Sequence, residues 1–210
     1  MSSSPLHVQS LHKQFGARVV LEDVSLKVEP AQVWRIAGGN GAGKSTLLGC
    51  IAGTLIPDSG ETLIAGHSLR DAPIDARAAL RYLPQAPPTP LGVSGREILT
   101  LYAELFDASG DDVTRVAEDS CLGDAIDELV STYSGGMRQR LMFHALRFGC
   151  PALVILDEPF AGVDRSGRTA FREQIDRWLA GGAGVVLATH EPDDPALDGL
   201  ATHLLELETG

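Results

Sequence analysis

A glycine-rich loop, Gly38–Thr46, has the residue types and the spacing needed to hold the phosphates of a nucleotide. Its sequence fits the pattern G-x-x-x-x-G-K-[ST], and four glycines lie within six positions. Glycine lets the backbone turn sharply, so successive N–H groups point inward, and the helix that follows adds the positive end of its dipole. The residues predicted to contact the phosphates are Gly38, Asn40, Gly41, Ala42, Gly43, Lys44, Ser45 and Thr46.

Lys44 and Ser45 close this loop with groups suited to a triphosphate and its metal ion. The Lys44 ammonium is expected to reach the β- and γ-phosphates, and the Ser45 hydroxyl is expected to bind Mg²⁺. The loop lies between an apolar strand pattern, Val33–Ala37, and a helix pattern, Thr46–Ile51. An ordinary glycine-rich turn is the alternative, and these flanking elements favour the nucleotide site.

Two acidic residues follow a second apolar strand pattern, Ala152–Leu156. Ligands of open α/β sheets bind at the carboxyl ends of the strands, where Asp157 and Glu158 are expected to lie. Asp157 suits the shell of a Mg²⁺ ion, and Glu158 suits the base that orients and deprotonates an attacking water. Solvated turn carboxylates are the alternative, which the phosphate loop makes the weaker interpretation.

Ser134, Gly135 and Gly136 precede a helix pattern that carries basic residues. An ordinary helix cap is one interpretation of this segment. The other is a second anion site, because a serine and two backbone N–H groups meet the positive end of a helix dipole. One nucleotide loop and a second phosphate site in the same chain suggest that two chains share a nucleotide.

Along the chain, the phosphate loop is followed by Ser134–Gly136 and then by the apolar strand that ends in Asp157 and Glu158. Motifs in this order resemble those of the ATP-binding cassette (ABC) family, and shorter motifs extend the resemblance over nearly the whole sequence. The resemblance implies a role for each of five further residues. Phe15 would stack on adenine, and Val20 would contact the base beside it. Gln85 would touch Mg²⁺ or water, and Asp164 would contact a second chain. His190 would bond the γ-phosphate or Glu158.

The resemblance implies an ATPase that works as a head-to-tail pair, with ATP and Mg²⁺ held between the phosphate loop of one copy and Ser134–Gly136 and Asp164 of another. Lys44, Glu158 and His190 would form the catalytic group. A separate transmembrane permease would be the further partner, and the motif style resembles export-type cassettes. The alternative is a non-transport ABC ATPase acting in DNA repair or on the ribosome. Long coiled coils, zinc inserts or second cassettes are usual there, and this sequence has none.

The sequence departs from the usual ABC motifs at a few positions. Gly39 stands where proline is frequent, Tyr133 where leucine is usual, and Met137 where glutamine is usual. None of these positions supplies the phosphate donors, so the site is expected to be active. Ala31-Gln32 replaces a frequent Gly-Glu turn.

The composition limits the choice of partner and compartment. The formal net charge of −11 argues against extended contact with nucleic acid phosphates, which rests on Lys and Arg. The apolar stretches are far shorter than the roughly 20 residues of a membrane helix, and the first residues lack the features of a signal peptide. Three widely spaced cysteines suit a reduced cytosolic protein. We therefore expect a cytoplasmic protein, peripheral on the inner face of the plasma membrane.

The pattern of elements predicts an α/β fold of the P-loop NTPase type, as a single domain over residues 1–210. Buried strand patterns that alternate with helix patterns indicate a mostly parallel core sheet. The strand patterns before the phosphate loop indicate an antiparallel N-terminal β subdomain. A proline-rich segment, Ala86–Pro90, opens a helical insertion of about residues 86–149. Within it, Ser94 and Glu97 form a predicted capping box, and Ser134 is expected to cap a helix that runs to about Phe148.

Overall fold

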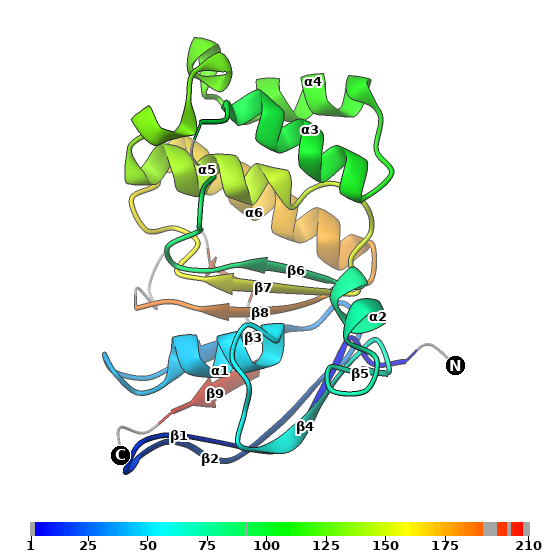
Figure 1. The fold of residues 1–210 in the computed structure, drawn as a ribbon, viewed down its shortest axis with the longest axis vertical. Helices are drawn as coiled ribbons and strands as arrows, with labels where there is room; N and C mark the ends of the chain where they lie inside the picture. The colour runs from blue at the N-terminus through cyan, green and yellow to red at the C-terminus, as the bar shows by residue number, and fades with distance from the viewer. Residues whose placement is uncertain (1–2, 91, 191–196, 201–202, 208–210) are drawn as a thin grey trace. The chain divides into compact units, whose positions relative to one another are not determined.

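A computed structural model describes residues 3–90, 92–190, 197–200 and 203–207 (Figure 1). Its contacts divide the chain into two compact units. The first unit comprises Met1–Pro84, Cys150–Glu158 and Ile175–Gly210, and the second comprises Gln85–Gly149 and Pro159–Gln174. The predicted α/β fold is confirmed: the strands described below lie in the first unit together with two helices, and the second unit is helical.

Two sheets form the framework of the first unit (Figure 1). The antiparallel sheet has the order β2 (Arg18–Val28), β1 (Leu6–Phe15), β4 (Ser59–Ile64) and β5 (His67–Ser68). The parallel sheet has the order β6 (Leu80–Leu83), β7 (Leu153–Asp157), β8 (Gly184–Ala188), β3 (Val33–Ala37) and β9 (His203–Glu206). Strand β3 lies between β8 and β9 and delivers the phosphate loop to the carboxyl edge of this sheet.

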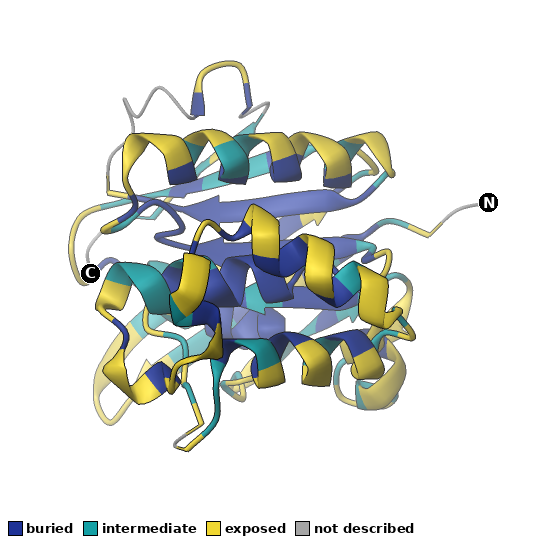
Figure 2. Cartoon of the chain, turned by 90° about the horizontal axis from the view of Figure 1, so that it is seen from above, coloured by how far each residue is buried: buried dark blue, intermediate teal, exposed yellow. Residues whose placement is uncertain are grey.

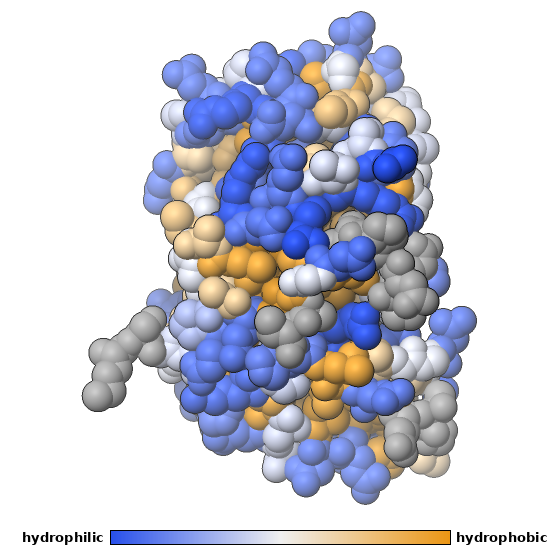
Figure 3. Space-filling view, turned by 180° about the vertical axis from the view of Figure 1, so that it is seen from behind, coloured by the Kyte–Doolittle hydropathy of each residue, from blue (hydrophilic) through white to orange (hydrophobic). Residues whose placement is uncertain are grey.

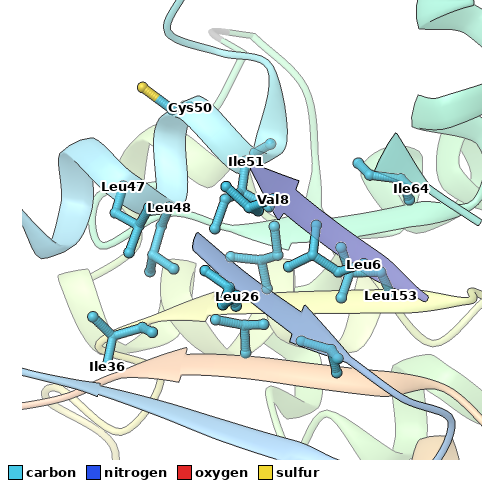
Figure 4. Packing of buried hydrophobic residues seen from close by; sticks show 14 of the residues in the cluster. Leu6, Val8, Leu26, Ile36, Leu47, Leu48, Cys50, Ile51, Ile64 and Leu153 are labelled. Atoms are coloured by element: carbon cyan, nitrogen blue, oxygen red, sulfur yellow. The ribbon is translucent and has the colours of Figure 1, made fainter. Parts of the chain in front are cut away.

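Helix α1 (Lys44–Ala52) joins the two sheets through one hydrophobic core. Its residues Leu47, Leu48 and Ile51 lie among side chains of the antiparallel sheet such as Val8 and Leu26 (Figure 4). Burying apolar surface in this way contributes about 25 cal/mol per Å². The start of α1, and with it the phosphate loop, is therefore fixed by packing on both sheets.

Strands β7 and β8 are buried at every position, as expected for the centre of a parallel sheet (Figure 2). They pair in register so that Asp157 lies opposite Ala188. The residues that follow the two strands, Glu158 and Thr189-His190, therefore leave the sheet at the same edge.

The second unit contains α3 (Gly95–Leu105), α4 (Gly110–Asp119), α5 (Gly135–Ala145) and the first part of α6 (Arg165–Ala180). The predicted capping box of Ser94 and Glu97 begins α3, and Ser109 and Asp112 form another at α4. The rings of Phe143 and Phe171 stack with centroids 3.6 Å apart, which ties α5 to α6.

Several elements differ from the sequence prediction. The helix capped by Ser134 ends at Ala145 and not near Phe148, because the chain turns there before Gly149. The weak helical pattern of Ala125–Val130 forms short 3₁₀ helices, Gly123–Asp127 and Val130–Thr132. The short helix α2 (Pro73–Ala78) was not predicted.

In the described part of the chain, no helix has both the length and the apolar character to cross a membrane. One face of the molecule carries mostly hydrophilic side chains, interrupted by smaller apolar areas (Figure 3).

Candidate functional site

The phosphate loop follows β3 with glycines where no other residue fits. Gly38 and Gly43 have φ values of 147° and 97°, which side chains rarely adopt. A Cβ on Gly38 would lie 2.6 Å from the carbonyl oxygen of Leu207, and a Cβ on Gly43 would lie 2.9 Å from Cγ1 of Val20. The loop is thus pressed against its neighbours in a shape that only glycine permits, as the sequence pattern predicts.

Lys44 lies over this loop. Its Nζ donates to the carbonyl oxygens of Gly38, at 2.7 Å, and Gly39, at 3.1 Å. These bonds hold the ammonium beside the backbone N–H groups of the loop, where it would meet a phosphate chain. The loop and Lys44 therefore bring together the groups that suit an anion, in a chain of net charge −11.

Ser45 and Asp157 are brought together from the start of α1 and the end of β7. The Ser45 hydroxyl hydrogen-bonds to the Asp157 carboxylate, which is only 2% exposed. Burial raises the pKa of Asp157, the neighbouring Glu158 adds to this rise, and the Ser45 bond and the Lys44 charge oppose it. A hydroxyl and a carboxylate are hard oxygen ligands of the kind that Mg²⁺ prefers.

Glu158 and His190 form a second pair at the same sheet edge. Nδ1 of His190 lies 2.7 Å from Oε2 of Glu158, and the His190 backbone N–H donates to the same oxygen at 3.2 Å. One carboxylate oxygen of Glu158 thus contacts both the ring and the backbone of His190. Glu158 also has a φ of 51°, a conformation that is uncommon away from glycine and is found at functional sites.

Phe15 and Val20 come from the hairpin of β1 and β2. Half of the Phe15 surface is exposed, and Nζ of Lys13 lies 5.2 Å from the centre of its ring. Val20 packs against the phosphate loop at Gly43. An exposed ring can present a flat face to a base.

Sequence analysis missed Arg18, which also reaches the loop. Its Nη2 donates to the carbonyl oxygen of Gly41 at 3.1 Å. Arg18 lies two positions before Val20 on the same strand, so both side chains share one face of β2. That alternation is the signal by which the sequence could have identified it.

The second unit holds the remaining predicted residues. Ser134 caps α5, and its hydroxyl accepts from the Met137 N–H at 3.2 Å. Ser134 and Gly135 are exposed, whereas a Cβ on Gly136 would lie 2.5 Å from the carbonyl oxygen of Gly162. Gln85 is exposed at the start of this unit. Ser134 and Gly135, at the start of α5, are therefore accessible in this structure.

Asp164 caps α6. Its Oδ1 accepts from the Gly167 N–H at 2.8 Å and from the Ser166 hydroxyl at 3.1 Å, and it pairs with Arg140 at 3.1 Å. The Gly167 bond, then the Ser166 bond and the Arg140 charge, lower the pKa of Asp164. The carboxylate therefore stays ionised while it fixes the start of the helix.

Comparison with known proteins decides the family. A model of the family described as ABC transporter matches residues 21–161, more than half of the sequence. The chain belongs to the ABC transporter family. It is 30% identical over 209 residues to the Nod factor export ATP-binding protein I of Cupriavidus metallidurans, covering 98% of this chain and 68% of that protein.

Two further ABC relatives agree. The daunorubicin resistance ATP-binding protein DrrA2 of Streptomyces coeruleorubidus is 30% identical over 214 residues, covering 100% of this chain and 66% of that protein. A solved structure described as "Structure of ATP binding subunit of ABC transporter" superposes with a TM-score of 0.86 at 30% identity, covering 97% of this chain and 86% of the other. The chain spans about two thirds of the length of these curated relatives.

The departures from the ABC motifs have visible structural consequences. Tyr133 is buried, and its hydroxyl donates to the carbonyl oxygen of Ala125. Met137 contributes its backbone N–H to the Ser134 cap. Ala31 adopts a φ of 59°, a conformation that glycine takes without strain. With tyrosine in place of the usual leucine, position 133 therefore makes a side-chain hydrogen bond within the second unit that leucine could not make.

Proposed function

We propose that this chain is the ATP-hydrolysing subunit of an ABC transporter, of the export type. Two neighbouring carboxylates beside the phosphate loop carry the proposal: Asp157 is bonded to Ser45, and Glu158 is bonded to His190. This arrangement supplies a metal-binding group and a base at the same sheet edge. A phosphate-binding module without catalysis would not require the second pair.

The residues of the first unit fit ATP and Mg²⁺. The loop glycines form a cradle that a Cβ would fill, and Lys44 supplies the cation for the β- and γ-phosphates. Ser45 and Asp157 would hold Mg²⁺, with Gln85 as a further ligand. The ion, when bound, neutralises charge on the phosphate oxygens. Phe15 and Val20 would hold the adenine.

Each catalytic residue has a distinct task in the proposed reaction. Glu158 accepts a proton from the water that attacks the γ-phosphate in line. His190 orients the Glu158 carboxylate through the Nδ1 contact of 2.7 Å. Lys44 and the N–H groups of the loop stabilise the charge that develops on the phosphate oxygens.

The second copy completes the site. Ser134, Gly135 and Gly136 of that copy would present the N-terminus of α5 to the γ-phosphate, and Asp164 would contact the facing chain. The exposure of Ser134 and Gly135 supports this role, because exposed donors can serve another molecule. Closure of the pair excludes water, and hydrolysis lets it reopen.

Two relatives carry names for export and drug resistance, which supports an export direction. We propose a permease as the membrane partner, with this chain bound to the cytoplasmic face of the membrane. No nucleic acid partner is expected for a chain of net charge −11.

The test is the dependence of ATP hydrolysis on protein concentration. If two copies share each ATP, the rate per molecule rises with concentration and levels off once dimers dominate. The measurement is phosphate release at saturating ATP and Mg²⁺ over a wide dilution series. A rate per molecule that stays constant down to extreme dilution would contradict the shared site.

A further inference from the structure

Arg18 places a cation on the phosphate loop that belongs to none of the predicted motifs. Its Nη2 donates to the carbonyl oxygen of Gly41 at 3.1 Å. The side chain is exposed, and it forms no ion pair with any residue that the structure describes. A guanidinium has five donors, so this single bond leaves others for a ligand.

The neighbouring strand fixes Arg18 at this place. Nη2 of Arg18 lies 3.8 Å from the position of a Cβ on Gly41, and Cγ1 of Val20 lies 2.9 Å from that of Gly43. Arg18 and Val20 are two residues apart on β2, as Gly41 and Gly43 are in the loop, so the same face of β2 lies along the loop. Packing at Val20 therefore holds the start of β2, and Arg18 with it, against the loop.

Arg18 also pairs with Phe15 across the hairpin of β1 and β2. Phe15 is the residue proposed to stack on the base, and Gly41 belongs to the loop proposed to hold the phosphates. A nucleotide that uses both must pass its ribose and first phosphate between them. Arg18 belongs to this stretch of the site, because it contacts one partner and pairs with the other.

Two other cationic side chains of this region, Lys44 and Lys13, have partners of their own. Nζ of Lys44 is bonded to two loop carbonyls, and Nζ of Lys13 pairs with Asp58 at 3.1 Å. Planar guanidinium groups match phosphate oxygens well. We propose that Arg18 is an additional nucleotide-binding residue, which contacts the phosphate chain on its ribose side. This inference rests on the proposed ATP-binding function.

The test compares Arg18→Gln and Arg18→Lys with wild type in equilibrium binding of ATP, ADP, AMP and adenosine. Arg18→Gln should weaken ATP binding about 5- to 20-fold, and the difference should shrink as salt is raised. Arg18→Lys should retain part of the affinity because it keeps the charge. Adenosine, which has no phosphate, should bind all variants equally.

Arg70→Gln is the matched control. Arg70 is exposed, and its Nη2 also donates to a glycine carbonyl, that of Gly60, at 3.0 Å, but it lies away from the phosphate loop. It should leave all four affinities unchanged. An unchanged ATP affinity in Arg18→Gln, or an equal loss for ATP and adenosine, would overturn the inference. Wild-type protein that fails to bind ATP would instead overturn the proposed function.

Discussion

The two units present their candidate residues in different states. In the first unit the two carboxylates are buried and each has a side-chain partner at the surface, Asp157 with Ser45 and Glu158 with His190. In the second unit Ser134 and Gly135 are exposed, and the Ser134 hydroxyl makes a single capping bond. The first unit thus resembles a preassembled catalytic half, and the second an open donor surface.

This difference indicates which part of the shared nucleotide site remains to be assembled. Preorganised groups lose little free energy in reorientation when charge develops, which favours catalysis in the first unit. Exposed N–H groups at a helix terminus remain available to an incoming anion. A shared site therefore needs only the approach of the second surface, because the acid–base chemistry is already in place.

Removal of the base in the preassembled half should give the largest effect. Glu158→Gln keeps the shape of the side chain but removes the proton acceptor, so turnover should fall roughly 10²–10⁴-fold. ATP affinity should hold, and ATP-bound dimers should accumulate. Steady-state phosphate release, ATP binding and size-exclusion chromatography with ATP measure these three outcomes.

Glu104→Gln provides the control, because Glu104 is exposed on α3 and should not affect turnover. If Glu158→Gln hydrolysed ATP at the wild-type rate, Glu158 would lose its role as the base. The contact between Glu158 and His190 would then be a structural one.

Blocking the open surface should separate turnover from binding. Ser134→Arg places a bulky side chain at the start of α5, so turnover should fall about 100-fold or more, the effect of losing an electrostatic donor. ATP affinity of the isolated chain should stay within about twofold, because the first unit holds the nucleotide. Ser109→Arg is the matched control, since Ser109 is an exposed cap of α4. Parallel loss of affinity and turnover in Ser134→Arg would refute the shared site.

Local patterns in the sequence predicted the parts of the site that depend on local geometry. The phosphate loop follows from glycine spacing, and the edge position of Asp157 follows from an apolar strand that ends in acids. The pairing of Glu158 with His190 has no local signal, because it depends on the parallel register of Asp157 with Ala188. Only the resemblance to ABC proteins suggested that contact.

Features that depend on packing escaped prediction. Arg18 reaches Gly41 only because β2 lies against the loop. The helix that follows Ser134 ends at Ala145, although the apolar pattern continues beyond it. Hydrophobic periodicity cannot separate a buried turn from a buried helical turn.

Two aspartates should show the smallest effects, with opposite signs. Burial raises the pKa of Asp157 above its ordinary value of 3.8, so its contribution to stability is full below that value and is lost as pH rises through the folded pKa. The Gly167 bond lowers the pKa of Asp164, so its contribution is present above 3.8 and is lost as pH falls through the folded pKa. In EDTA at pH 7, Asp157→Asn should therefore raise the urea midpoint, and Asp164→Asn should lower it.

A series of urea titrations can follow how the two differences depend on pH. The Asp157 difference should shrink as the pH is lowered through its folded pKa toward 3.8, whereas the Asp164 difference should persist down to 3.8 and shrink below it. Equal signs for the two variants would contradict the comparison. A stabilising Asp157→Asn would mean that the first unit keeps a carboxylate that its own fold disfavours. Such a residue is explained by what it binds, whereas Asp164 is already explained by the helix that it caps. The direction of the pKa shift therefore distinguishes a carboxylate kept for chemistry from a carboxylate kept for structure.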